Sequence, residues 1–277
     1  MSVRALVLAG YGLNCDYETA HALTLAGAEA RRVHISDLTG TAQASPTETL
    51  DGYQILVFDG GFSWGDDHGA GVLLATRLRN HLGEQLRAFL ARGGLVMGIC
   101  NGFQALVNLG LLPMLDGRWE RSVALMANEC GNFQDRWVEL LTEPASPCLF
   151  TRGLTRLDLP IRHGEGRFVA EATTLSVIES RGMVAVRYGD GKGKPARGRF
   201  PMNPNGSAGD IAGICDPTGR VFGLMPHPEG FYRLSQHPDY TLSREKARRR
   251  GGDLAPLAAG DGLTMFVNAV QAAKDAL

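Results

Sequence analysis

Short apolar runs alternate with amphipathic stretches through the first part of the chain. Buried parallel strands are predicted over 4–10 (RALVLAG), 30–38 (ARRVHISDL), 53–66 (YQILVFDGGFSWGD) and 93–100 (GGLVMGIC). A helix is predicted from Asp16, a candidate N-cap, to a stop at Gly27, and a second helix over 68–91. The first part therefore reads as strand and helix in alternation.

The second half is richer in strand patterns. Strands with turn signals between them are predicted over 136–142 (RWVELLT), 176–180 (SVIES), 183–188 (MVAVRY) and 211–225 (IAGICDPTGRVFGLM). Loops are predicted by composition over 39–50, 189–207 and 231–261, the last of which contains Arg248–Arg250. An amphipathic helix is predicted over 262–277. The arginine run is interpreted as a solvated face, and docking of a partner is the alternative.

These elements predict an α/β fold with a doubly wound, mostly parallel sheet flanked by helices and with extra β-hairpins in the second half. The whole chain, 1–277, is expected to form one domain. Sites in such sheets lie at the carboxyl ends of the strands. The glycine turns at 60–61 and 98–102 fall at such ends.

Charge and cysteine usage narrow the class of protein. The net charge of −1 gives no sign of nucleic-acid or membrane binding. A strand pattern starts almost at the first residue, with no signal-peptide pattern and no long apolar run, so a cytoplasmic protein is expected. The five cysteines form no C-x-x-C pair, so neither a metal site nor a disulfide framework is predicted.

Cys100 is the first candidate for chemistry. It lies in Gly98-Ile99-Cys100-Asn101-Gly102, between a predicted strand and a predicted helix. A G-x-C-x-G turn at that place is typical of a nucleophile elbow, because only glycine fits the sharp turn and the helix N-terminus favours a thiolate. A buried structural cysteine in a glycine turn is the alternative reading.

A nucleophilic cysteine needs a base and donors for an oxyanion. His227 and Glu229 lie two residues apart in an extended, proline-flanked segment, so the carboxylate can orient the imidazole. The backbone N–H groups of Gly60, Gly61 and Asn101 are candidate donors.

These residues and several further segments resemble one family. The segments are GGFSWGD (60–66), GICNGFQ (98–104), NECGNFQDRW (128–137), IRHGEGRF (161–168), NPNGS (203–207) with IAGI (211–214), and GLMPHPE (223–229). In this order they resemble the class I, Cys-His-Glu triad glutamine amidotransferases, whose sheet is flavodoxin-like. Among these, HGEGRF and NPNGS resemble the glutaminase subunits of phosphoribosylformylglycinamidine synthase.

The resemblance implies a hydrolysis of L-glutamine in which Cys100 attacks, His227 transfers protons and Glu229 orients His227. It implies that Gly61 and Asn101 hold the oxyanion. Gly60, Phe62 and Gln104 are then expected to line the glutamine pocket. His163 is expected to be a positioning residue; a direct role as base is the alternative.

The resemblance also implies partners. Ammonia would pass to a separate synthetase subunit that binds ATP and magnesium and makes formylglycinamidine ribonucleotide in purine biosynthesis, with a small accessory subunit in some complexes. This chain has no phosphate-loop motif and no cofactor of its own is expected. The alternatives are an amidotransferase that serves another acceptor synthetase, and a catalytically silent binding module of the same fold.

Some positions depart from the family pattern. The chain has YGLNCD (11–16) where Gly-Ser usually precedes Asn-Cys-Asp, Asp59 where proline is common, and Gly230 where arginine usually follows H-P-E. The segment 231–261 is longer than in short members. Cys15, in the NCD stretch, is interpreted as buried at a strand–helix turn rather than as reactive.

Overall fold

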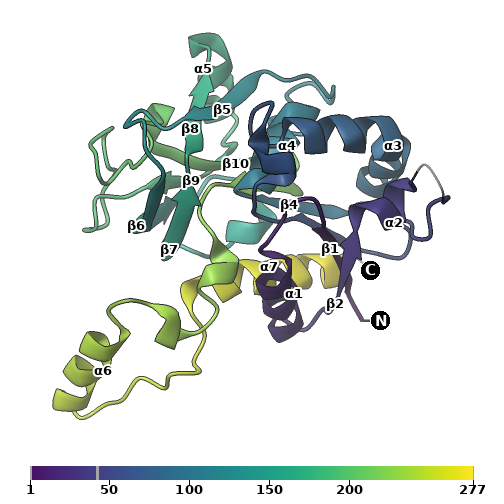
Figure 1. Cartoon of the computed structure of the whole chain (residues 1–277). Helices are drawn as coiled ribbons and strands as arrows, with labels where there is room; N and C mark the ends of the chain where they lie inside the picture. Colours follow the sequence, from purple (N-terminus) through teal and green to yellow (C-terminus); the bar gives the residue numbers. More distant parts are fainter. Residues whose placement is uncertain (1, 42–43, 277) are drawn as a thin grey trace.

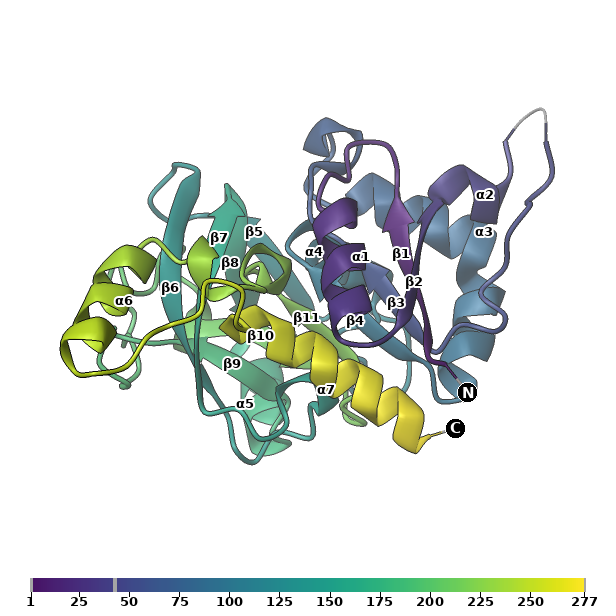
Figure 2. The same cartoon turned by 90° about the horizontal axis from the view of Figure 1, so that it is seen from below.

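The structure is a computed structural model that describes residues 2–41 and 44–276. Residues 42–43 of the predicted loop 39–50, and Leu277 of the predicted terminal helix, lie outside the described residues. Figure 1 shows a central sheet with helices on both sides, and Figure 2 shows the same arrangement from below.

A nine-stranded sheet forms the centre, in the order β2-β1-β3-β4-β11-β10-β9-β6-β7. The pairs from β2 to β11 are parallel, and the pairs from β11 to β7 are antiparallel. The strands are β1 (Arg4–Ala9), β2 (Glu29–His34), β3 (Ile55–Phe58), β4 (Leu95–Ile99), β6 (Gln134–Thr142), β7 (Arg156–His163), β9 (Val184–Tyr188), β10 (Ile211–Cys215) and β11 (Val221–Leu224).

Helices cover both faces of the sheet, as predicted for a doubly wound fold. One face carries α3 and α4, which pack on each other, and the other carries α1 and α7. The helices are α1 (Asp16–Leu25), α2 (Ile35–Thr39), α3 (Val72–Ala91), α4 (Asn101–Leu109), α5 (Ala172–Ser180), α6 (Tyr240–Arg249) and α7 (Asp261–Asp275). Every residue of β3 and β4 is buried, because both faces of these strands are covered.

A smaller two-stranded sheet, β5 (Val123–Ala127) with β8 (Glu165–Ala170), lies beside the antiparallel half. The prediction of a strand at 176–180 is wrong, since this stretch belongs to α5. Leu175 and Ile178 follow the helical spacing of three, and only Ile178 is buried in this helix. The β-branched residues favoured a strand, but packing of one helical face decided the structure.

The segment predicted as a loop at 231–261 contains secondary structure. It carries the short helix η5 (Leu234–Gln236) and α6, none of whose residues is buried. Figures 1 and 2 show it as an arm that projects from the body before the chain returns to α7. Arg248 and Arg249 are exposed and pair with Glu245, which agrees with a solvated face.

Several predicted boundaries are shifted. The stretch 30–38 divides into β2 and α2, and the helix predicted over 68–91 begins at Val72. Cys15, rather than Asp16, takes the N-cap position of α1, and Ala26 caps its other end just before Gly27. The loop 189–207 contains no regular element.

Candidate active site

Cys100 sits at a strained turn between β4 and α4. Its φ of 51° and ψ of −105° are unusual for a residue other than glycine. A Cβ on Gly102 would lie 2.5 Å from the carbonyl carbon of Phe58, and one on Gly98 would lie 2.8 Å from the backbone of Gly102. A side chain at either glycine would therefore collide with the backbone, as predicted, and the turn has the geometry of a nucleophile elbow.

The strand order brings His227 to the same edge of the sheet as Cys100. β11 pairs in parallel with β4, and the N–H of Cys100 donates to the carbonyl of Leu224 at 2.8 Å. The N–H of His227 in turn donates to the carbonyl of Pro160 at 2.8 Å, which fixes the backbone just before the imidazole.

His227 and Glu229 form a buried pair, as predicted. The expectation of a wholly extended segment is wrong, because His227 is extended but Pro228–Gly230 form the short 3-10 helix η4. Nδ1 of His227 lies 2.5 Å from Oε1 of Glu229, and both side chains are almost fully buried. Burial opposes a charge on His227, but the negative charges of Glu229 and Cys100 raise its pKa well above the usual value. The environment therefore stabilises an imidazolium between a carboxylate and the cysteine.

Gly60 and Gly61 follow β3, the neighbour of β4 on its other side. Gly61 forms an antiparallel bridge with Leu13, flanked by hydrogen bonds from Asn14 to Gly60 and from Phe62 to Gly12. In that pattern the N–H of the bridged residue points away from its partner strand. Among residues 2–41 and 44–276 the N–H of Gly61 therefore makes no bond to the Leu13 segment and can donate to another acceptor, as an oxyanion donor must.

Asn101 is the first residue of α4, so its N–H belongs to the unpaired first turn. Its side chain accepts from the N–H of Ser63 at 3.3 Å and donates to Asp66 and Gln104 at 3.0 Å each. These bonds tie the helix start to the glycine turn, so both expected donors are held in one rigid unit.

Gln104 and Phe62 occupy different environments. Gln104 is buried; its amide oxygen accepts from Asn101, and its amide nitrogen donates to the carbonyl of Glu165 at 2.5 Å. Phe62 is 45% exposed, and its ring centroid lies 6.3 Å from that of Phe133. That these residues and Gly60 line a glutamine pocket stays a prediction.

His163 is buried and its tautomer is fixed. Its Nδ1 donates to Oδ1 of Asn128 at 3.1 Å, while Asn128 Nδ2 donates to the carbonyl of His163. Burial, with the nearby positive charge of His227, lowers the pKa of His163 to about 3. A neutral, clamped ring fits the expected positioning role better than a role as base.

Two residues beside the His–Glu pair were not predicted as part of the site. Sγ of Cys15 lies 3.9 Å from Nδ1 of His227, and the N–H of Cys15 donates to the fully buried Asp59 at 3.1 Å. Cys15, His227 and Glu229 are also the one group of potential metal ligands found among residues 2–41 and 44–276, all within 4.8 Å. The NCD motif was the available sequence signal, but nothing in it indicates a contact with a residue so far along the chain.

The fold and this site define a class of protein. A cysteine at a nucleophile elbow, with a buried His–Glu pair just after the neighbouring strand β11 and the Gly61 N–H on the other side, can carry out acyl transfer through a thioester. Residues 2–271 match the family described as the CobB/CobQ-like glutamine amidotransferase domain.

Individual relatives narrow the family further. The chain is 46% identical over 271 residues to phosphoribosylformylglycinamidine synthase subunit PurQ of Methanococcus maripaludis, covering 97% of this chain and 96% of that protein. It is 44% identical to the subunit of the same name from Dehalococcoides mccartyi, covering 98% of each. The chain belongs to the CobB/CobQ-like glutamine amidotransferase family and, within it, to the PurQ subunits of phosphoribosylformylglycinamidine synthase.

Solved structures agree with the fold. A chain in the structure of PurLQS from Thermotoga maritima superimposes with a TM-score of 0.68 at 29% identity, covering 98% of this chain and 99% of that one. A glutamine amidotransferase from the same organism has a TM-score of 0.53 at 12% identity, which shows the shared fold alone. Within residues 2–41 and 44–276, no helix is long and apolar enough to cross a bilayer.

Proposed function

We propose that this chain hydrolyses L-glutamine at Cys100 and delivers the ammonia to a separate ATP-dependent synthetase subunit that makes formylglycinamidine ribonucleotide. The observation that carries the proposal is the buried His227–Glu229 pair, 2.5 Å apart, just after the strand β11 that pairs with the strand leading into the cysteine elbow. Family membership supports the substrate, since the relatives are subunits of that synthase.

The first half of the reaction forms a thioester. The thiolate of Cys100 attacks the side-chain carbonyl carbon of glutamine, and the carbonyl electrons move to oxygen. The N–H groups of Gly61 and Asn101 donate to this oxyanion. When the oxyanion collapses, the C–N bond breaks, and the imidazolium of His227 gives its proton to the departing nitrogen, which leaves as ammonia.

The second half regenerates the enzyme. Neutral His227 takes a proton from water, and the water oxygen attacks the thioester carbonyl. The C–S bond then breaks, which releases glutamate and returns the thiolate and imidazolium. Glu229 holds Nδ1 throughout, so that Nε2 faces the reacting atoms. Within the described residues Nε2 of His227 has no hydrogen-bond partner, which leaves it available for this transfer.

The partner follows from chemistry and from the relatives. The chain has no phosphate-loop motif, so the ATP and magnesium of the synthesis are expected on another subunit. The solved relative comes from a PurLQS assembly, which supports a synthetase subunit and a small accessory subunit as partners of this chain too.

The test separates glutamine hydrolysis on this chain from the synthesis step on the partner subunit. Cys100→Ala, mixed with the synthetase subunit, is expected to lose glutamine-dependent synthesis by several orders of magnitude and to keep synthesis from added ammonium salt. Cys148→Ala is the matched control, because it also removes a buried thiol. If Cys100→Ala kept its glutamine-dependent activity, or lost the ammonia-dependent activity as well, the proposed division of labour would be wrong.

A chemical label tests the site in the chain alone. Diazo-oxo-norleucine, a glutamine-like electrophile, is expected to modify Cys100 alone, with protection by excess glutamine, as mapped by mass spectrometry. Modification that glutamine does not block, or that spreads over all five cysteines, would argue against a glutamine-shaped pocket.

A further inference from the structure

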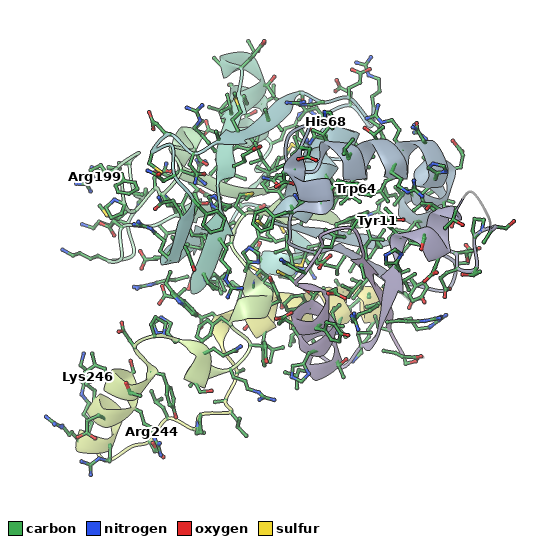
Figure 3. The ribbon with its side chains drawn as sticks, in the orientation of Figure 1. Tyr11, Trp64, His68, Arg199, Arg244 and Lys246 are labelled. Atoms are coloured by element: carbon green, nitrogen blue, oxygen red, sulfur yellow. The ribbon has the colours of Figure 1, made fainter. Side chains whose placement is uncertain are left out.

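The turn between β1 and α1 lies directly against the site, although the reaction steps above do not use it. Three backbone hydrogen bonds join it to the segment that follows β3: Asn14 N–H to Gly60 O at 3.0 Å, Phe62 N–H to Gly12 O at 2.8 Å, and Trp64 N–H to Tyr11 O at 2.7 Å. The rings of Tyr11 and Trp64 stack at 4.7 Å and close the outer end of this ladder (Figure 3). The turn therefore pairs, like an additional strand, with the segment that is expected to hold the oxyanion.

The two segments approach too closely for side chains. A Cβ on Gly61 would lie 2.7 Å from Cα of Leu13, and one on Gly12 would lie 3.0 Å from the carbonyl carbon of Phe62. Gly12 also has a φ of +100°, which residues with side chains rarely adopt. The orientation of the Gly61 N–H therefore depends on the turn, because the ladder fixes the peptide planes on either side of it.

The turn also reaches the base. A Cβ on Gly60 would lie 2.7 Å from Cε1 of His227 and 3.2 Å from Sγ of Cys15, so the imidazole and the thiol meet above this glycine. Cys15 contacts Nδ1 of His227 on the same edge as Glu229. The thiol therefore fills the space into which the ring would otherwise tilt or water would enter.

Asp59 anchors Cys15 from behind. Its Oδ2 accepts the N–H of Cys15, and its Oδ1 is buried without a hydrogen-bond partner among the described residues. Burial, with the negative charges of Asp16 and Glu229, raises the pKa of Asp59 well above its usual value. Burial raises the pKa of Cys15 to about 11. The Cys15 thiol is therefore neutral at pH 7, and burial disfavours a charge on Asp59 that would compete with Glu229 for the imidazolium.

We propose that the Tyr11–Cys15 turn is a positioning element of the catalytic centre: its backbone orients the Gly61 N–H, and the Cys15 thiol, held by Asp59, fixes the imidazole of His227. This inference rests on the proposed function and assigns a role to the NCD motif. Cys15 is a positioning residue, since it acts through His227 and contacts no reacting atom.

The test compares full-length wild type with Cys15→Ala and Cys148→Ala. Each variant removes one buried thiol, but Cys148 lies next to Cys215, at the start of η2 (Leu149–Thr151), and is not part of the site. The readouts are the maximal rate of Cys100 labelling by diazo-oxo-norleucine, the half-saturating reagent concentration and the melting temperature. We expect Cys15→Ala to lower the maximal rate about tenfold, with an unchanged half-saturating concentration, because the base rather than the pocket is disturbed.

The pH profile of labelling is a readout that lost stability alone would not move. The titratable groups around His227 are Glu229 on its own segment, Cys15 on the turn, Cys100 at the elbow, His163 on β7 and, behind Cys15, Asp59. The Cys15 contact favours the imidazolium of His227, and that positive charge favours the Cys100 thiolate, which reacts with the label. In Cys15→Ala the rate of labelling is therefore expected to rise at a higher pH than in wild type, whereas in Cys148→Ala it should rise at the wild-type pH.

Two substitutions of Asp59 test whether its hydrogen bond to the N–H of Cys15 positions the thiol. Asp59→Asn keeps an oxygen for the N–H of Cys15 and is expected to label Cys100 within about twofold of wild type, since a carboxyl group and an amide have the same shape. Asp59→Ala is expected to behave like Cys15→Ala. A wild-type rate and pH profile in Cys15→Ala would overturn this inference alone, whereas an unlabelled Cys100 in wild type would overturn the proposed function and the inference with it.

Discussion

Gly102→Ala tests the claim that the elbow exists because two backbones approach each other closely. The added Cβ would lie 2.5 Å from the carbonyl carbon and 2.8 Å from Cβ of Phe58, whereas ordinary contact begins at 3.4 Å. The carbonyl oxygen of Phe58 lies nearer still, so helix α4 would have to retreat from β3 by at least about 1 Å, the difference between 2.5 and 3.4 Å. β3 cannot yield, because it is paired on both sides, with β1 and with β4.

Two opposing effects set the size of the change. Alanine is the better helix former by about 1 kcal/mol, while overpacking a rigid core costs about 1–3 kcal/mol or more. The steric cost should reach the upper end of its range, because both partners are backbone, so after the helix gain is subtracted we expect the free energy of unfolding to fall by about 2 kcal/mol. A retreat of the helix also displaces Cys100 and the Asn101 N–H, and a misplacement of about 1 Å lowers kcat about 100-fold.

Gly83→Ala is the matched control. Gly83 lies within α3, and nothing lies within 4 Å of the Cβ it would gain. This variant should gain about 1 kcal/mol and keep full activity. Urea unfolding gives the stabilities, and glutamine hydrolysis in the assembled complex gives kcat. If Gly102→Ala were as stable and as active as Gly83→Ala, the argument from close backbone contact would be refuted.

Substitutions at three further residues test other parts of the site and its surroundings. Glu229→Gln should lower kcat by about 10³–10⁴ with little change in KM, because the imidazole loses its charged partner and its tautomer control; a loss confined to KM would contradict this. For His163, whose folded pKa of about 3 lies below the ordinary 6.5, the unfolded chain binds the extra proton between these values. The free energy of unfolding should therefore fall as pH decreases, by up to about 1.4 kcal/mol per pH unit, and His163→Asn should flatten that slope in denaturation series at pH 4–7; parallel curves would refute it. Glu139→Ala should speed tryptic cleavage at the loop lysines, because Oε1 of the buried Glu139 accepts the N–H groups of Gly191 and Gly193 at 3.0 and 2.9 Å; Glu139→Gln, which keeps an acceptor oxygen, should stay resistant, and equal cleavage of both variants would show that the contact does not hold the loop.

The sequence by itself determined the features that depend on local pattern. The apolar runs of β3 and β4, buried along their whole length, predict parallel strands. Cys100 between two glycines predicts an elbow, and His227 and Glu229 two residues apart predict their hydrogen bond, although Pro228–Gly230 form a 3-10 helix rather than the extended segment expected. Each of these statements depends on residues that are neighbours in the chain, where backbone geometry leaves few choices.

Tertiary structure decided the elements whose local signals were weak or misleading. The β-branched residues of α5 suggested a strand, yet the stretch is a helix that buries only Ile178. The polar composition of α6 suggested a loop, since a helix with no buried face has no apolar period to reveal it. That the hairpins of the second half extend the same sheet as the parallel strands depends on the pairing of β11 with β4, which no local pattern specifies.

The sequence also could not predict those contacts of the site that join residues far apart in the chain. Cys15 and His227 are separated by 212 positions, and Cys15 and Asp59 by 44. Only the parallel order of β1, β3, β4 and β11 brings their carboxyl ends to one edge. A motif names the residues that react, whereas the order of strands in the sheet determines which side chains surround and orient them, because those neighbours are set by long-range packing rather than by spacing along the chain.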